Sequence, residues 1–298
     1  GSIMNKVIKI GLFLIIVGLV AFVVYSVLDE RFPAFADEEF TLVEREYAKD
    51  RFTDIATDLI NQQVIILPSD NENIVIKYYD SEHLYITVDE GDAVLTLTGV
   101  SERTFFGFFT GWSYLVSPEY ARFYLYLPAE TYALDLTTAN GKISMSNYLH
   151  ATTVKLESSN GDIVLADVDV AGPISLRTSN GKITLTNVEA TGDLTLKTSN
   201  GKVVLTDVVA EDIDCESLNG NIEASRAEFA ALDARTSNGS ITITIVGAFE
   251  DFYLKMITTN GKYYLNGERT QQNAFNTSAA ILVDLQTANG NIAVNFTE

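Results

Sequence analysis

The side chains best suited to chemistry in this chain recur beside an Asn-Gly dipeptide that repeats through its second half. Hydrolysis of a glycosidic bond needs two carboxyl groups about 5–10 Å apart. Lys142, Asp162 and Lys182 occupy the same position in successive repeats. If the repeats stack, these side chains predict a row of opposite charges rather than a catalytic pair, worth about a few tenths of a kcal/mol per pair. The residues that follow the dipeptides are Lys142, Asp162, Lys182, Lys202, Asn221, Ser240, Lys262 and Asn291.

Other catalytic and metal-binding patterns are absent from the sequence. His83 and His150 lie far apart, and neither a His-x-x-x-His nor a Cys-x-x-Cys spacing occurs. There is no Gly-x-Ser-x-Gly motif, no phosphate-binding loop and no glycine-rich calcium repeat. We therefore expect no catalytic residue, no metal site and no cofactor. A polysaccharide-active enzyme is kept as an alternative, because β-solenoids include such enzymes.

The Asn-Gly dipeptides recur at a nearly constant interval, with spacings of 20, 20, 20, 19, 19, 22 and 29 residues. A fixed period near 20 is typical of a repeat architecture. The dipeptides are Asn140-Gly141, Asn160-Gly161, Asn180-Gly181, Asn200-Gly201, Asn219-Gly220, Asn238-Gly239, Asn260-Gly261 and Asn289-Gly290.

Apolar residues flank each dipeptide at fixed distances. Around Asn180, for example, they are Ile174, Leu176 and Ile183. Alternate residues of a strand share one face, so we expect these side chains to point inward and Thr, Ser, Lys and Asp to point outward. Each repeat is predicted to be two short strands around the Asn-Gly corner, plus a connection such as residues 187–192. The single cysteine, Cys215, occupies an inward position, which predicts a buried side chain and excludes an internal disulfide.

Two all-β architectures fit this pattern. In a β-meander, Asn-Gly would form type I′ hairpin turns. In a parallel β-solenoid, each repeat is one coil, and the corners stack about 4.8 Å apart as a ladder of asparagines. Stacked coils must match in length, so the constant spacing favours the solenoid. We expect glycine to supply left-handed backbone at the corner. The longest spacing, before Asn289, predicts a looped-out insertion near residues 267–278 on the last coil.

The first 39 residues predict a membrane anchor. Residues 1–6 are a tag remnant and a cytoplasmic start, residues 7–28 are long and apolar enough for a transmembrane helix, and residues 29–39 form a linker. Lysines precede the apolar run and acidic residues follow it, so the N-terminus is expected in the cytoplasm and the rest outside the cell membrane. Cleavage after Ala36 is the alternative.

Residues 40–130 predict short strands without a clear period, which would serve as irregular first coils and a cap for the repeats at 131–298. One stretch within them does not alternate. Its aromatic side chains either close the end of the core as a lid or form an exposed loop that contacts the membrane or a partner. They are Phe105, Phe106, Phe108, Phe109, Trp112 and Tyr114.

The charge of the chain restricts its partners. Beyond residue 36 it carries 17 basic and 38 acidic side chains, a net charge of −21. Such a surface repels nucleic acid and anionic headgroups. It favours cationic partners, such as a basic peptide or the basic face of an envelope protein, although acidity also serves solubility alone.

These features together resemble a bacterial family known as putative adhesins, which includes LiaG-like membrane-anchored proteins of Gram-positive envelope-stress operons. The resemblance covers about residues 40–298 and implies a surface-exposed, non-enzymatic protein of adhesion or envelope stress. Its motifs specify the fold rather than an activity, because the family has no assigned catalytic residues. The matching phrases are Leu127-Pro128, Leu136-Thr137-Thr138-Ala139-Asn140-Gly141-Lys142-Ile143, Thr178-Ser179-Asn180-Gly181-Lys182-Ile183 and Thr198-Ser199-Asn200-Gly201-Lys202-Val203.

Overall fold

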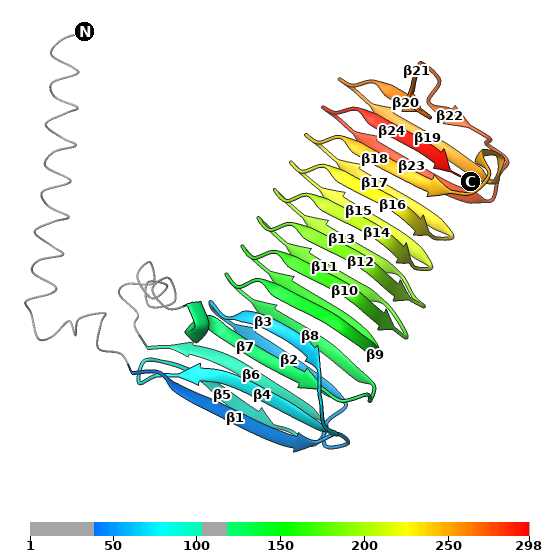
Figure 1. Ribbon diagram of the computed structural model, residues 1–298. Coiled ribbons are helices and arrows are strands. Elements are labelled where there is room, and N and C mark those ends of the chain that lie inside the picture. Colours follow the sequence, from blue (N-terminus) through cyan, green and yellow to red (C-terminus); the bar gives the residue numbers. More distant parts are fainter. Residues whose placement is uncertain (1–38, 103–117, 298) are drawn as a thin grey trace, which may run out of the picture.

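A computed structural model describes residues 39–102 and 118–297, which form one elongated stack of β-strands (Figure 1). Two short 3-10 helices, η1 (Pro118–Ala121) and η2 (Phe249–Asp251), are the helical elements of these residues. The predicted anchor and the aromatic stretch at residues 105–114 lie outside the described residues.

No helix within residues 39–102 and 118–297 is long and apolar enough to cross a membrane.

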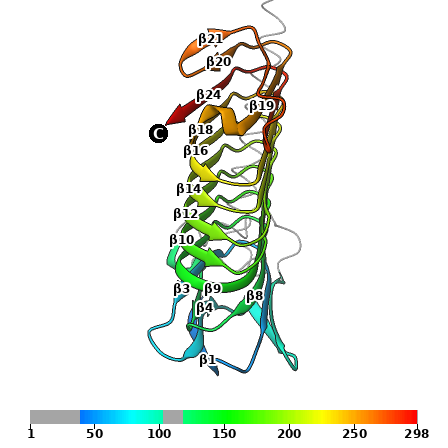
Figure 2. The same ribbon diagram turned by 90° about the vertical axis from the view of Figure 1, so that its right-hand side faces the viewer.

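Each regular coil contributes one strand to each of two opposed faces, as the turned view shows (Figure 2). Face 1 holds the strands that precede each Asn-Gly corner, and face 2 holds the strands that follow it. On face 1 these are β8 (Tyr132–Thr138), the second half of β9 (Ile143–Ser158), β11 (Ile174–Thr178), β13 (Leu194–Thr198), β15 (Asp212–Ser217) and β17 (Ala231–Thr236). On face 2 they are the first half of β9, β10 (Ile163–Val170), β12 (Ile183–Ala190), β14 (Val203–Val209), β16 (Ile222–Glu228) and β18 (Ile241–Val246).

Neighbouring strands are parallel and in register from coil to coil. Ile163 on β10 faces Ile183 on β12, which faces Val203 on β14. A strand therefore pairs with its equivalent one coil away and not with the strand that follows it in the chain. This pairing excludes the β-meander and confirms the parallel solenoid.

The core is a set of apolar columns between the two faces. Leu176, Leu196, Cys215 and Ala234 form one column, and each has no exposed surface. The burial that the sequence predicts for Cys215 is confirmed. Because every coil contacts the coils on either side, the columns form one continuous core along the stack.

At the start of the stack, the order of the coils in space differs from their order in the chain. β2 (Asp54–Leu59) and β3 (Gln63–Pro68) form a coil inserted between β8–β9 and an outer coil of β6 (Val94–Ser101) and β7 (Arg122–Leu127). Antiparallel strands cover the outer coil: β5 (Leu84–Glu90) pairs with β6, β4 (Asn73–Asp80) with β7, and β1 (Thr41–Ala48) with β4. The cap replaces a row of unpaired backbone groups with paired ones.

The far end of the stack has the same exchange of order. The last coil in the chain, β23 (Ile281–Thr287) and β24 (Ile292–Thr297), lies between β17–β18 and a terminal coil of β19 (Phe252–Thr258) and β20 (Tyr263–Leu265). β21 (Glu268–Thr270) and β22 (Ala274–Phe275) pair antiparallel on the outside. The predicted insertion at residues 267–278 is therefore not a loop on the last coil. It caps the terminal coil. The chain then returns to form the coil β23–β24 between the terminal coil and β17–β18.

The corner glycines are required for a different reason from the one that the sequence suggests. None of the eight glycines of the Asn-Gly pairs has a positive φ, so the expectation of left-handed backbone there is wrong. A Cβ atom added at Gly201 would lie well inside contact distance of the carbonyl oxygen of Gly181 in the adjacent coil. Glycine is needed because the corners stack backbone on backbone.

The left-handed residues lie instead within the face 2 strands. Asn147, Asp167, Asn187, Asp207 and Arg226 have φ between 52° and 56°. Four of the five are Asn or Asp, the residue types that tolerate left-handed backbone best after glycine. The connection predicted at residues 187–192 is mostly strand, because β12 continues through this bend to Ala190.

Replacing a corner glycine by alanine tests the stacking constraint. We expect Gly201→Ala to lower the free energy of unfolding by more than about 3 kcal/mol, because the added methyl group meets backbone that the neighbouring coils hold in place. The measurement is chemical denaturation followed by circular dichroism.

Gly267→Ala is the matched control, because a Cβ there meets nothing within 4 Å and only its φ of 79° is unfavourable. It should lower stability by about 1–2 kcal/mol. Equal losses for the two variants would contradict the stacking argument.

Candidate functional site

The asparagines of the corners form a hydrogen-bonded ladder along one edge of the stack. Each Nδ2 group donates to the Oδ1 atom of the asparagine in the neighbouring coil, at 2.6–2.8 Å. The ladder follows the order of the coils in space, so Asn289 lies between Asn238 and Asn260. It begins at Asn61, which the sequence analysis missed because Gln62 follows it in place of glycine. These amides are exposed, and they bind one another.

A second, buried ladder of hydroxyl groups lies directly beneath the asparagines. The Thr198 hydroxyl donates to the Gly181 carbonyl of the previous coil at 3.1 Å and accepts from the Gly201 amide at 3.0 Å. The alternation of the sequence predicts threonine on the outer side, but at this position it points inward. Equivalent donors are Thr138, Ser158, Thr178, Ser217, Thr236, Thr287 and Thr258. The Thr/Ser-x-Asn-Gly phrase is thus explained by stacking alone.

Where the residue after a corner glycine is Asp or Asn, its side chain accepts a hydrogen bond from the backbone of a neighbouring coil. The Asp162 Oδ1 atom accepts from the backbone N–H of Lys182 at 2.7 Å, and Asn221 accepts in the same way from Ser240 at 2.9 Å. The sequence predicts that Asp162 pairs with the ammonium groups of Lys142 and Lys182. This prediction is wrong, because the Asp162 carboxylate binds the backbone N–H of Lys182 instead. A short carboxylate or amide side chain reaches the adjacent amide, whereas the longer Lys202 side chain extends past it to the Glu223 carboxylate at 2.6 Å.

The outer side of face 1 carries carboxylates that are largely paired with cations. Lys155 binds Asp135 at 3.1 Å, and Lys255 binds Asp284 at 2.7 Å. Arg235 pairs with Asp233, and burial raises the pKa of that Asp233 carboxyl although Arg235 opposes the shift.

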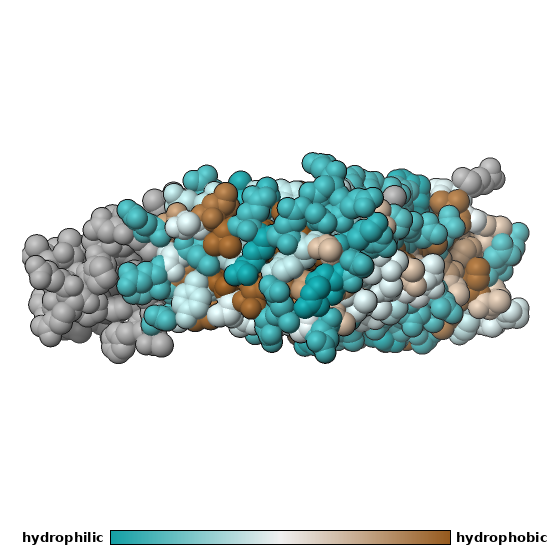
Figure 3. Space-filling model, turned by 90° about the horizontal axis from the view of Figure 1, so that it is seen from below, coloured by the Kyte–Doolittle hydropathy of each residue, from teal (hydrophilic) through white to brown (hydrophobic). Residues whose placement is uncertain are grey.

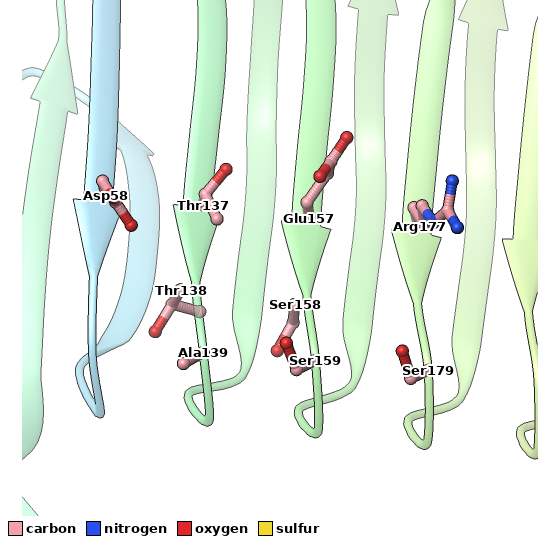
Figure 4. Close-up of a pocket in the computed structure, with 9 residues that line it drawn as sticks. All are labelled: Asp58, Thr137, Thr138, Ala139, Glu157, Ser158, Ser159, Arg177 and Ser179. Atoms are coloured by element: carbon pink, nitrogen blue, oxygen red, sulfur yellow. The ribbon is translucent and has the colours of Figure 1, made fainter.

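A shallow polar pocket lies on the same outer side, next to the asparagine corner (Figure 4). Four adjacent strands contribute Asp58, Thr137, Glu157 and Arg177 in one row. Hydroxyl groups line its lower rim, among them Ser159 and Ser179. No described carboxylate lies within 4.0 Å of Arg177, so its guanidinium is available for a polar ligand.

The edge opposite the asparagine ladder carries carboxylates of a different kind. There Asp169 on β10 lies in register with Glu189 on β12, and Asp193 and Asp212 directly precede the paired residues Leu194 and Ile213. We call this surface the acidic edge. Its members are Asp169, Glu189, Asp193, Glu211, Asp212 and Glu228.

The acidic edge lacks counter-charges. None of its members has a lysine or arginine within 4.0 Å among the described residues, and the segments 168–173, 188–193, 208–212 and 227–231 contain neither residue type. All members are exposed except Asp169, which is half-buried. Like charges about 5 Å apart repel one another, so a cationic ligand would relieve this repulsion. Figure 3 shows one side of the stack, on which hydrophilic side chains predominate and hydrophobic groups stay small and separate.

The family of the chain follows from a comparison of its sequence with family models. The model described as Toastrack DUF4097 matches residues 52–295, which include both the irregular first coils and the regular repeats. This chain belongs to the Toastrack DUF4097 family. The expectation of a β-repeat family is confirmed at this level.

Solved structures similar to this Toastrack chain share little sequence with it. A putative adhesin from Bacteroides fragilis NCTC 9343 is 13% identical and has a TM-score of 0.49, covering 86% of this chain and 97% of its own. A putative cell adhesion protein from Clostridium sporogenes ATCC 15579 is 13% identical at a TM-score of 0.30, covering 88% and 100%. A putative lipid binding protein from Parabacteroides distasonis ATCC 8503 is 14% identical at 0.35, covering 87% and 97%. No curated protein matches the chain.

The Toastrack coils offer little of the chemistry that would need a metal or a nucleophile. Within residues 39–102 and 118–297, no group of three or more His, Cys, Asp or Glu side chains could hold a metal ion. Burial raises the pKa of the Cys215 thiol, so this side chain stays protonated and unreactive. Of the predicted site residues, the structure brings the asparagines and glycines of the corners together, while Phe105, Phe106, Phe108, Phe109, Trp112 and Tyr114 lie outside the described residues.

The buried hydroxyl ladder of this Toastrack protein is tested by Thr198→Val, which keeps the shape of the side chain and removes its hydroxyl group. The Gly181 carbonyl and the Gly201 amide then lose a partner, and each buried unpaired group costs about 1–3 kcal/mol. We expect unfolding at clearly lower denaturant concentration.

Thr195→Val, on the outer side of the same strand, is the control and should change stability by less than about 0.5 kcal/mol. If both variants unfold at the wild-type midpoint, the hydroxyl ladder contributes nothing to stability.

Proposed function

We propose that this Toastrack protein is a non-catalytic binding protein of the cell envelope. Residues 7–28 anchor it in the cell membrane by a single pass, with the N-terminus in the cytoplasm and the stack outside. The partner is a cationic peptide or the basic surface of an envelope protein, bound at the acidic edge. In this proposal, the protein has a role similar to that of the LiaG-like proteins of envelope-stress operons, which its sequence resembles.

The observation that carries the proposal is the contrast between paired and unpaired carboxylates. On face 1, Asp135, Asp233 and Asp284 each have a cationic side chain within ion-pair distance. At the acidic edge, the described structure provides none. Stacking places Asp169 beside Glu189, and Asp193 beside Asp212, about 4.8 Å apart, which is the distance between strands. An extended chain rich in lysine or arginine would meet a rigid cluster of negative charges without having to order it first.

A membrane-anchored position agrees with a peptide-binding role. Cationic peptides gather at anionic membrane surfaces, where electrostatic attraction adds to apolar burial. A rigid acidic edge tethered a short distance away would compete for them. Capture at that edge would reduce the peptide that reaches the bilayer.

Binding of a lysine-rich probe peptide tests this proposal. We expect the full chain in nanodiscs to bind the peptide, with an affinity that falls as salt rises from about 50 to about 300 mM. Replacing Glu189, Asp193, Glu211 and Glu228 by their amides should weaken binding about tenfold, or about 1.4 kcal/mol. Calorimetric titration gives both values.

The matched control removes the same number of charges from face 1. Asp135→Asn, Glu157→Gln, Asp214→Asn and Glu216→Gln together should weaken binding by less than about twofold, because these carboxylates already have partners. Equal losses in the two variants would show that only net charge matters. Absence of salt-sensitive binding would refute the proposal.

The polar pocket favours a second candidate function, a polysaccharide-active enzyme. Asp58 and Glu157 lie two strands apart with Arg177 beside them, which provides two carboxyl groups and a cation in one depression. A general acid usually holds its proton through burial. Here Asp58 is exposed, and Glu157 lies 3.6 Å from the Lys155 ammonium. This arrangement is better suited to binding a polar ligand than to proton transfer.

Incubation with cell-wall glycans separates these two functions. We expect the full chain to release no reducing ends, and Asp58→Asn and Glu157→Gln to behave like the wild type. Turnover that either substitution abolishes would establish the enzyme and reject the non-catalytic proposal.

A further inference from the structure

Tyrosine side chains gather on the outer side of face 2 at the start of the stack. Tyr124 and Tyr126 lie on β7 with ring centroids 6.0 Å apart, and Tyr79 on β4 contacts Tyr120 in η1 at 5.1 Å. All are half-buried, so each exposes part of its ring or its hydroxyl group. We call Tyr79, Tyr120, Tyr124 and Tyr126 the aromatic patch.

Two cationic side chains and two aliphatic ones extend the patch. The Lys77 ammonium lies 5.8 Å from the centroid of the Tyr126 ring, and an Arg122 nitrogen lies 3.5 Å from the Tyr124 hydroxyl. On the neighbouring strand β3, Ile65 and Leu67 face Tyr124 and Tyr126 and point to the same side. The outer side therefore combines phenol, ammonium, guanidinium and apolar groups, with the Glu44 carboxylate on β1 paired to Lys77 at 3.1 Å.

The regular coils have no equivalent of this patch. In the first four residues of β10, β12, β14, β16 and β18, the outward positions hold small or β-branched side chains and one glutamate, and no aromatic residue. They are Val164, Ala166, Thr184, Thr186, Val204, Thr206, Glu223, Ser225, Thr242 and Thr244. Tyrosine is thus concentrated at one end of face 2, and repetition of the coil does not require it there.

The chain enters the described fold at this patch. The Phe40 ring stacks on Tyr120 with centroids 4.5 Å apart, and Thr41 faces Asp80 at the start of β1. Figure 1 shows the start of β1 and η1 at the same edge of the stack. The linker 29–39 reaches at most about 40 Å when fully extended. The thirteen described strands of face 2 span about 60 Å, so the proposed anchor keeps this end of the stack within reach of the membrane, while the other end can lie about 60 Å further away.

We propose that the aromatic patch rests in the headgroup layer of the bilayer that holds the anchor. Tyrosine is enriched at membrane–water interfaces, because its ring enters the apolar boundary while its hydroxyl group stays hydrated. The exposed Arg122 guanidinium supplies donors for a lipid phosphate, whereas the Lys77 ammonium is already paired with Glu44 at 3.1 Å. The inference deepens the proposed function and rests on its membrane anchor. It orients the stack, with the first coils on the lipid and the coils of the acidic edge further along.

Quenching by brominated lipid tests this orientation. The full chain is placed in phosphatidylcholine nanodiscs whose lipids carry bromine near the headgroup, with a fluorophore on Glu119→Cys next to Tyr120. Cys215 is buried and its thiol pKa is raised, so labelling goes to the engineered cysteine. We expect brominated lipid to lower the emission at least about twofold at this site. A label on Glu268→Cys, at the far end of the stack, should be unaffected.

Tyrosine variants show whether the patch itself makes the contact. Tyr79→Ser, Tyr124→Ser and Tyr126→Ser together should restore most of the emission at position 119. The matched double variant, Tyr253→Ser with Tyr264→Ser at the other end of the stack, should leave the emission at position 119 quenched. Thermal melting followed by circular dichroism checks that each variant is folded, and the comparison of positions 119 and 268 in the wild-type background does not depend on these variants.

The outcomes separate the inference from the proposed function. A chain that floats with vesicles but shows equal quenching, or none, at positions 119 and 268 keeps the anchor and overturns the aromatic contact. Retained quenching at position 119 in the folded tyrosine variant also overturns the contact. A full chain that does not float with vesicles removes both the anchor and the inference.

Discussion

The direct stacking of one backbone corner on another is the constraint on which this fold depends. At each corner a glycine leaves room for the carbonyl of the coil beside it, as Gly201 does for Gly181. The hydroxyl of Thr198 and the amide of Asn200 then bond to the same neighbouring coil. Thr198, Asn200 and Gly201 thus join one corner to the next. Within the ladder, only the first corner, Asn61-Gln62, lacks the glycine, and a side chain at a corner between two Asn-Gly coils would hold these coils apart and break both ladders.

The same stacking determines where charge accumulates. On the two faces, successive strands bring opposite charges together, as in Lys155 with Asp135 and Lys202 with Glu223. At the edge opposite the asparagines, the repeat brings acidic residues beside acidic residues. Parallel, in-register pairing brings Asp169 against Glu189 and Asp193 beside Asp212, so that neighbouring coils together hold a cluster of uncompensated carboxylates. Binding at such a cluster would follow from the architecture and needs no pocket.

Both ends of the stack are finished by the same device. The chain forms an outer coil, covers it with antiparallel strands and places another coil inside it. At the start β2–β3 is the inner coil, and at the far end β23–β24 is. The antiparallel strands use the edge that would otherwise pair with a second molecule. Capping also brings Phe40, Tyr79 and Tyr120 together, although these residues are far apart in the chain.

The sequence by itself determined the coil, its period, the parallel stack and the burial of Cys215, because these follow from local spacing repeated many times. It did not determine that Gly201 is needed for close approach rather than for backbone twist, or that Thr198 points inward, because both depend on a neighbouring coil. It also missed Asn61 in the ladder and the insertion of β23–β24, since neither follows the period. The acidic edge and the aromatic patch were decided by tertiary structure alone. Each joins residues from several coils or strands, and only the stacking of those elements brings their side chains together.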